Sequence, residues 1–194
     1  MPILPAEPDC NPPTLWEDPA IYASNGETRW WCLHTKPRQE KATARDLKAL
    51  GLVYYLPQVL KDSHTPKGRR LQSVVPLFVG YLFLKGDEHA RLAAFRAHRL
   101  VNVLDVVDQN SIATDLKQIY TMLSSGLPVI PEEVVPVGAT VRITTGPLTG
   151  MVGKVIRRAK RDQFVAVVHF LGRGATVDLQ DWQVELVSEG SRSE

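Results

Sequence analysis

The residue types that most often carry chemistry are sparse in this 194-residue chain. Only two cysteines occur, Cys10 and Cys32, so neither a disulfide framework nor a four-cysteine zinc site can be built. Cys32 and His34 share one face of an expected strand, but two ligands do not complete a metal site. The sequence also lacks a nucleophile elbow and a dinucleotide fingerprint. We therefore expect no enzymatic activity, no metal and no cofactor.

Glycines and a proline crowd the segment VRITTGPLTGMVGKVIRR, residues 141–158. A phosphate-binding loop would need glycine where Leu148 stands and Ser or Thr where Val155 stands, so that motif fails twice. Proline fixes one backbone angle and glycine permits positive φ, which predicts a chain reversal at Gly146 and Gly150. Gly153, inside the following strand, predicts a close backbone approach. The glycines therefore indicate strand and turn geometry.

Positive charge gathers in two places. The formal net charge is +2, but the first 28 residues hold five acids and no Lys or Arg, so the remainder carries +7. The two clusters are Lys61, His64, Lys67, Arg69 and Arg70, and Lys154, Arg157, Arg158, Lys160 and Arg161. The first cluster can contact phosphates without reading sequence, and the second can touch RNA or an acidic protein surface. The alternative for both is a solvated surface, because loops and small barrels need charged exteriors.

Strand and helix patterns alternate over residues 29–124 and predict an α+β sheet domain. The expected strands are 30–35, 53–60, one or two within 71–85, and 100–107, and the expected helices are 37–50, 88–97 and 114–124. The strands at 53–60 and 71–85 flank the first basic cluster, which predicts a long hairpin with a basic tip.

The rest of the chain divides by composition. Residues 1–28 are expected to form an acidic, proline-rich tail. Two alternatives are open for part of it, packing on the first domain or an irregular conformation. Residues 125–136 have the composition of a linker. Residues 137–187 contain five short strand patterns without a helix, which predicts a small closed barrel. Residues 188–194 form a C-terminal tail. The chain lacks a signal peptide and a bilayer-spanning segment, so we expect a cytoplasmic monomer that does not bind a membrane.

The glycine-rich segment and the later run FLGRGATVDLQDWQVELV together resemble the KOW motif and KOW barrel of the NusG family of transcription elongation factors. WWCLHTKPRQEKA resembles the opening strand and helix of the NusG N-terminal (NGN) domain, and PLFVGYLFLK resembles its Gly-Tyr strand. The resemblance covers residues 30–187. It implies an NGN antiparallel sheet flanked by helices, joined by a linker to an SH3-like KOW β-barrel. Pro-Leu-Phe resembles the specialised RfaH-like paralogues, but Val79 stands where proline is common, so the subfamily stays open.

The resemblance implies that the NGN domain binds the clamp helices of RNA polymerase. By position in the motif, the contact residues are His34, Phe78, Tyr81 and Phe83. Alternate strand residues share a face, so we expect Tyr81 and Phe83 to be displayed together for the partner. Packing of all these aromatic residues in the core is the alternative.

Two further sites follow from the resemblance. Lys61, Lys67, Arg69 and Arg70 would lie near upstream or non-template DNA. Phe170, Leu171, Gly172 and Arg173 would meet a ribosomal protein or the termination factor Rho, with packing at the barrel end as the alternative. The predicted function is transcription elongation, antitermination or termination control. The alternative is a KOW-type RNA-binding module of the ribosome or of ribosome assembly.

Overall fold

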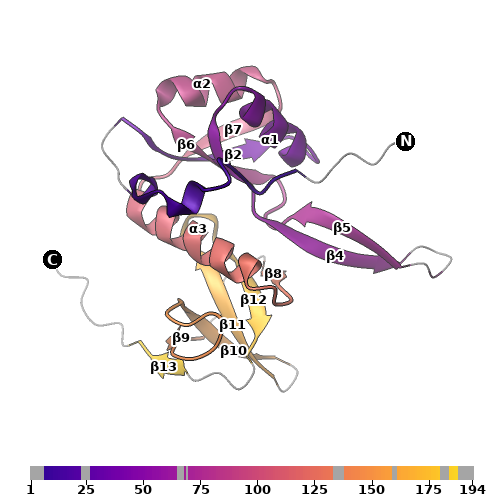
Figure 1. The fold of residues 1–194 in the computed structure, drawn as a ribbon, viewed down its shortest axis with the longest axis vertical. Helices are drawn as coiled ribbons and strands as arrows, with labels where there is room; N and C mark the ends of the chain where they lie inside the picture. The colour runs from indigo at the N-terminus through magenta and orange to yellow at the C-terminus, as the bar shows by residue number, and fades with distance from the viewer. Residues whose placement is uncertain are drawn as a thin grey trace. The chain divides into compact units, whose positions relative to one another are not determined.

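The computed structural model describes residues 7–22, 27–64, 68, 70–132, 138–158, 161–179 and 184–187 (Figure 1). It divides into two compact units, Met1–Thr114 and Asp115–Glu194. The division falls within helix α3 (Gln109–Ser124). Each unit is described by itself.

Unit 1 is built on a five-stranded antiparallel sheet with the strand order β1-β3-β6-β2-β7. Its strands are β1 (Cys10–Asn11), β2 (Arg29–Thr35), β3 (Val53–Tyr55), β6 (Tyr81–Gly86) and β7 (Leu100–Asp105). Strands β6 and β2 lie side by side inside the sheet, and their residues Trp31, Leu33, Leu82 and Leu84 alternate onto one buried face. This alternation is the period-2 pattern of strands buried against a covering layer.

Two helices cover that face, α1 (Glu40–Ala49) and α2 (Glu88–Arg96). Ala44 and Leu47 of α1 and Ala94 of α2 join the same apolar cluster as the strand residues. Helix α2 is capped at its N-terminus by Asp87, whose carboxylate accepts a hydrogen bond from the Ala90 N–H at 2.8 Å, which satisfies a backbone donor of the first turn.

The N-terminal segment, residues 7–22, packs on the sheet. It supplies edge strand β1 and two short 3-10 helices, η1 (Leu15–Glu17) and η2 (Pro19–Ile21). Trp16 stacks on Trp30 with ring centroids 6.0 Å apart and meets Tyr55 edge to face at 5.0 Å. Part of the expected tail thus packs against the sheet face opposite α1 and α2, which gives unit 1 aromatic residues on both faces of its sheet.

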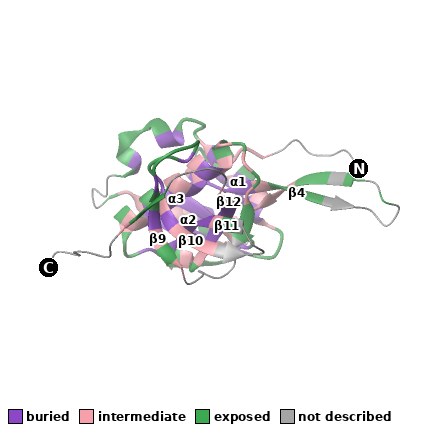
Figure 2. Ribbon diagram, turned by 90° about the horizontal axis from the view of Figure 1, so that it is seen from below, coloured by how far each residue is buried: buried purple, intermediate pink, exposed green. Residues whose placement is uncertain are grey.

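The predicted hairpin is present. Among the described residues, strands β4 (Gln58–His64) and β5 (Arg70–Pro76) pair only with each other, and they project as a two-stranded ribbon from unit 1 (Figure 1). Residues of β4 are exposed along the ribbon (Figure 2). Among the described residues, no helix is long and apolar enough to cross a membrane.

Unit 2 contains an all-antiparallel sheet with the strand order β13-β9-β10-β11-β12-β8. Its strands are β8 (Ile130–Glu132), β9 (Ala139–Ile143), β10 (Val152–Arg158), β11 (Arg161–Val168), β12 (Arg173–Asp178) and β13 (Val184–Leu186). Among the described residues, each strand of this sheet pairs with the next one in that order, from β13 at one end to β8 at the other. The α+β architecture predicted from the sequence is confirmed, with an all-β domain following a helix-covered sheet.

The glycine-rich segment forms the expected reversal between β9 and β10. Gly146 and Gly150 have φ values of 93° and 89°, which suit glycine far better than other residues. A Cβ added at Gly153 would lie 2.4 Å from the Val165 backbone oxygen and 2.6 Å from the Phe164 ring. The predicted close approach at Gly153 is therefore confirmed.

Strand β8 lies within residues 125–136, where the composition predicts a linker. It pairs with β12 through the partners Ile130–Thr176 and Gly174–Glu132. Pro131 lies inside this strand and has no backbone N–H to donate. It is tolerated because β8 is the last strand of its sheet, with no neighbouring strand on its open side among the described residues. Three residues with a central proline give no strand pattern in the sequence.

Candidate functional site

A tight turn joins β5 to β6 and is fixed from several sides. The Tyr81 N–H donates to the Phe78 oxygen at 3.0 Å, and Gly80 has φ of 85°. The Gly80 oxygen accepts a hydrogen bond from the Thr35 N–H of β2 at 2.9 Å. The Gly80 N–H donates to Glu40 Oε1 of α1 at 2.7 Å. The turn is thus held by both a strand and a helix.

His34 and Tyr81 form the accessible aromatic pair of this turn. They are directly opposite each other in the β2–β6 pairing, and their rings stack with centroids 5.0 Å apart at 17°. Both are half-buried, whereas the neighbouring Val79 is 70% exposed. His34, Val79 and Tyr81 together are called the Tyr81 surface below. It is a preformed surface with two flat rings and an apolar tip.

The two phenylalanines predicted for the same contact are placed differently. Phe78 is 2% exposed and Phe83 is 0% exposed, and their rings meet edge to face at 6.3 Å. Phe83 does share a face of β6 with Tyr81, but it lies opposite Cys32 and Tyr55 in the sheet interior. The expectation that Phe83 is displayed beside Tyr81 is wrong in this structure, because its part of the face is covered.

Sequence reasoning missed Glu40 and Gly80 as parts of this site. Glu40 is only 5% exposed, and a buried carboxylate requires hydrogen-bond partners. Its position in the first turn of a helix gives a generic N-terminal signal and does not reveal a partner 40 residues further along the chain.

The basic hairpin is described only in part. Lys67 and Arg69 lie outside the described residues. Lys61 and Arg70 are both exposed, and the β4–β5 register pairs Lys61 with Ser73 and His64 with Arg70. Because side chains alternate along a strand, Lys61 and Arg70 point to opposite faces of the ribbon. Arg70 also pairs with Asp62 at 2.7 Å, and that hydrogen bond raises the pKa of Arg70.

The predicted contact of unit 2 forms one short turn. Phe170 and Leu171 belong to the 3-10 helix η3 (His169–Leu171), Gly172 ends it with φ of 61°, and Arg173 begins β12. Phe170 is 38% exposed. The turn is anchored at its start, because the buried Asp115 carboxylate accepts the His169 N–H at 2.9 Å. The structure brings all four predicted residues together.

Cys32 and His34 do not form a reactive pair. Cys32 is fully buried, and burial raises the pKa of its thiol to about 12. Across the part of the chain that the structure describes, no group of three or more His, Cys, Asp or Glu could hold a metal ion.

A helix-covered sheet with a preformed aromatic surface is NGN-like, and the all-antiparallel β sheet that follows it is consistent with a KOW domain. Residues 28–123 match the family model described as transcription termination factor nusG. The chain belongs to the NusG family, whose members are non-enzymatic transcription factors. Membership of this family implies RNA polymerase binding.

The other comparisons add little to this assignment. No curated protein gives a significant match. A solved structure titled "Domain interaction in Thermotoga maritima NusG" is similar, with 17% identity, a TM-score of 0.45, and coverage of 85% of this chain and 100% of that chain. The family assignment rests on the match over residues 28–123.

Proposed function

We propose that this protein is a transcription elongation or antitermination factor that binds the clamp of RNA polymerase through its NGN domain and recruits a second factor through its KOW domain. The observation that carries the proposal is the stacked His34–Tyr81 pair on a turn fixed by Glu40 and Thr35. Tyrosine is enriched at binding hot spots. A surface whose rings are already ordered loses little conformational entropy on binding.

The mechanism is differential binding. A ligand shifts a conformational equilibrium only when it binds one state more tightly than the other. A factor bound to the clamp of elongating polymerase would therefore favour that conformation over paused ones. In this proposal the Tyr81 surface makes the contact, and Phe78 and Phe83 support the turn and strand from beneath.

The KOW domain supplies the second contact in this proposal. Phe170, Leu171, Gly172 and Arg173 would meet a ribosomal protein or Rho. The support is local: Phe170 is an exposed apolar side chain beside an anchored turn, and Arg173 places a cation next to it. Aromatic and arginine side chains are both enriched at protein interfaces.

The β4–β5 ribbon would lie near upstream or non-template DNA. Exposed cations on a projecting ribbon attract phosphates without reading bases. Lys61 and Arg70 are the described members of this set, and Lys67 and Arg69 complete it in the sequence.

The first test is binding of the full chain to RNA polymerase from its own source, compared with His34→Ala and Tyr81→Ala. We expect each variant to bind at least about tenfold more weakly, as hot-spot truncations do. Phe95→Ala is the matched control, because Phe95 is 47% exposed on α2. Circular dichroism verifies that each variant is folded.

Two outcomes would contradict the proposal. Unchanged polymerase binding by both folded variants would remove the Tyr81 surface from the contact. Failure of the parent to bind polymerase, together with binding of structured RNA through the KOW domain, would favour the RNA-binding alternative.

A further inference from the structure

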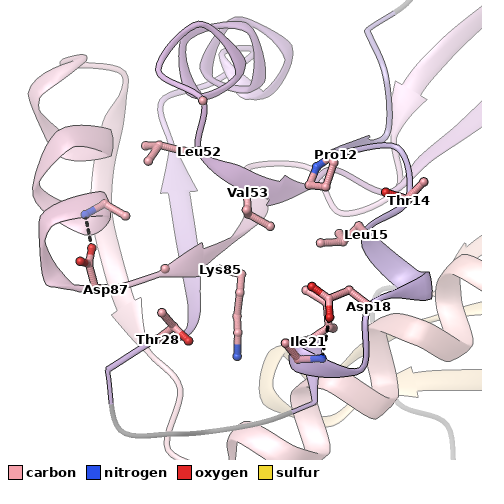
Figure 3. A pocket seen from close by; sticks show the side chains of 14 residues that line it. Pro12, Thr14, Leu15, Asp18, Ile21, Thr28, Leu52, Val53, Lys85 and Asp87 are labelled. Atoms are coloured by element: carbon pink, nitrogen blue, oxygen red, sulfur yellow. Dashed lines mark hydrogen bonds between the residues drawn. The ribbon is translucent and has the colours of Figure 1, made fainter.

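A cavity of about 420 Å³ lies in unit 1 between the N-terminal segment and the sheet (Figure 3). Leu15 and Ile21 of the N-terminal segment line it on one side, and Leu52 and Val53, at the start of β3, line it on another. Its volume falls within the range of about 300–1,000 Å³ that is typical of small-molecule pockets. The apolar walls come from two stretches of chain that are far apart in the sequence.

Lys85 brings the main positive charge to this cavity. It comes from the central strand β6, is 8% exposed, and its side chain extends into the space (Figure 3). Its Nζ lies 6.0 Å from the centroid of the Trp30 ring. Burial lowers the pKa of Lys85. An anion brought close to a buried amine would favour the charged form again.

Two carboxylates also border the cavity, and both have structural roles. Asp18 Oδ1 accepts the Ala20 N–H at 2.8 Å, and Asp87 Oδ1 accepts the Ala90 N–H at 2.8 Å. The hydrogen bond from Ala90 is the main cause that lowers the pKa of Asp87. The lowered pKa keeps Asp87 ionised near neutral pH, and carboxylate groups at the border oppose entry of a multiply charged anion such as phosphate.

We propose that this cavity binds a small monocarboxylate with an aromatic or branched aliphatic body. The carboxylate meets the ammonium group of Lys85, and the body packs between Leu15 and Ile21 on one side and Leu52 and Val53 on the other. The site is separate from the Tyr81 surface and does not depend on the proposed polymerase contact.

Binding would have a structural consequence. The ligand contacts the N-terminal segment and the sheet at once, so it stabilises the state in which the segment is docked. Hydrogen exchange of backbone amides in residues 10–22 should therefore slow when the site is occupied.

The test is calorimetric titration of the full chain with phenylacetate, indole-3-acetate and 4-methylpentanoate. We expect at least one of these to bind saturably. Its neutral amide should bind about tenfold more weakly or worse, because its oxygen can still accept a hydrogen bond from Lys85 but carries no negative charge. Inorganic phosphate should also bind about tenfold more weakly or worse, because carboxylates border the cavity. Lys85→Met should lose about tenfold in affinity, because methionine keeps the apolar stem without the charge. Lys48→Met, at an exposed position of α1, should bind as the parent does.

A second measurement does not depend on any variant folding. In the parent protein labelled with ¹³C-lysine, the Cε resonance of Lys85 should titrate at higher pH when the carboxylate is bound. Saturable binding by none of the three carboxylates, equal affinity of the amide, tighter binding of phosphate, or an unmoved Lys85 titration would each overturn the proposal. Any of these results leaves the polymerase test with His34 and Tyr81 unaffected.

Discussion

Tyr81 and Phe83 lie on one face of β6, yet their surroundings differ. Phe83 is fully buried, whereas Tyr81 is half-buried and stacks on His34. Phe83→Ala should therefore lower the free energy of unfolding by about 3–5 kcal/mol, as expected when a buried aromatic residue is replaced by a cavity. Tyr81→Ala should cost about 1 kcal/mol, near the value of an aromatic pair. Urea denaturation of both variants measures the difference.

Phe95→Ala serves as the control for that comparison, with a change expected within about 0.5 kcal/mol. Equal losses for Tyr81→Ala and Phe83→Ala would contradict the different roles assigned to them. This comparison also explains why Phe83→Ala is a poor probe of binding, since a loss of stability would be confounded with weaker polymerase binding.

The two cysteines should be inert in the folded protein. Burial raises the pKa of Cys32 to about 12 and that of Cys10 to about 11. Because the thiolate is the reactive form, both thiols stay protonated at pH 8 in the folded protein. A chromogenic disulfide reagent should react with neither of them at pH 8 and with both after denaturation in guanidinium. Rapid reaction of either cysteine without denaturant would show that the site opens or that the thiol is exposed.

At the scale of elements, the two faces of the β4–β5 ribbon lead to a prediction about DNA binding. Lys61→Glu and Arg70→Glu should each weaken DNA binding and reduce the salt dependence of the affinity, by about 0.7–0.9 in the logarithmic slope for each phosphate that is no longer neutralised. Since the two side chains point to opposite faces, a strand bound to one face should make the two effects unequal. Fluorescence anisotropy with single-stranded and duplex DNA over a range of KCl concentrations measures this.

Lys48→Glu is the matched charge reversal on the exposed side of α1. If all three variants lose the same affinity, the effect is one of total charge. If Lys61→Glu and Arg70→Glu bind DNA as the parent does, the ribbon is not a DNA-binding element.

How well an element could be predicted depended on whether its pattern is local. Strands β2 and β6 and helices α1 and α2 follow from periodicity within their own residues. Strand β1 has two residues and β8 has three, so neither has a period to detect. Their positions depend on partners, β3 and β12, that lie far along the chain. The same limit hid Glu40 and the cavity around Lys85, because each is assembled from distant segments.

At the scale of the whole molecule, β8 extends the sheet of unit 2 into the region expected to be a linker. A fragment of residues 127–194 should therefore be more stable than one of residues 138–194, which lacks β8. Both should give far-ultraviolet circular dichroism spectra dominated by strands. A contribution of about 1 kcal/mol from β8 corresponds to a rise of about 4–8 °C in Tm for domains of this size. A helical spectrum from either fragment would contradict a stable β domain.

The docked N-terminal segment bears on how this protein should be divided for expression. The family match begins at residue 28, and a fragment cut there would look complete by sequence. It would lose β1, leaving the backbone of β3 as an open edge, and it would lack Trp16, which packs on Trp30 and Tyr55. Open strand edges beside uncovered aromatic side chains favour self-association. The trimmed domain should therefore accumulate as insoluble aggregates where the full chain does not.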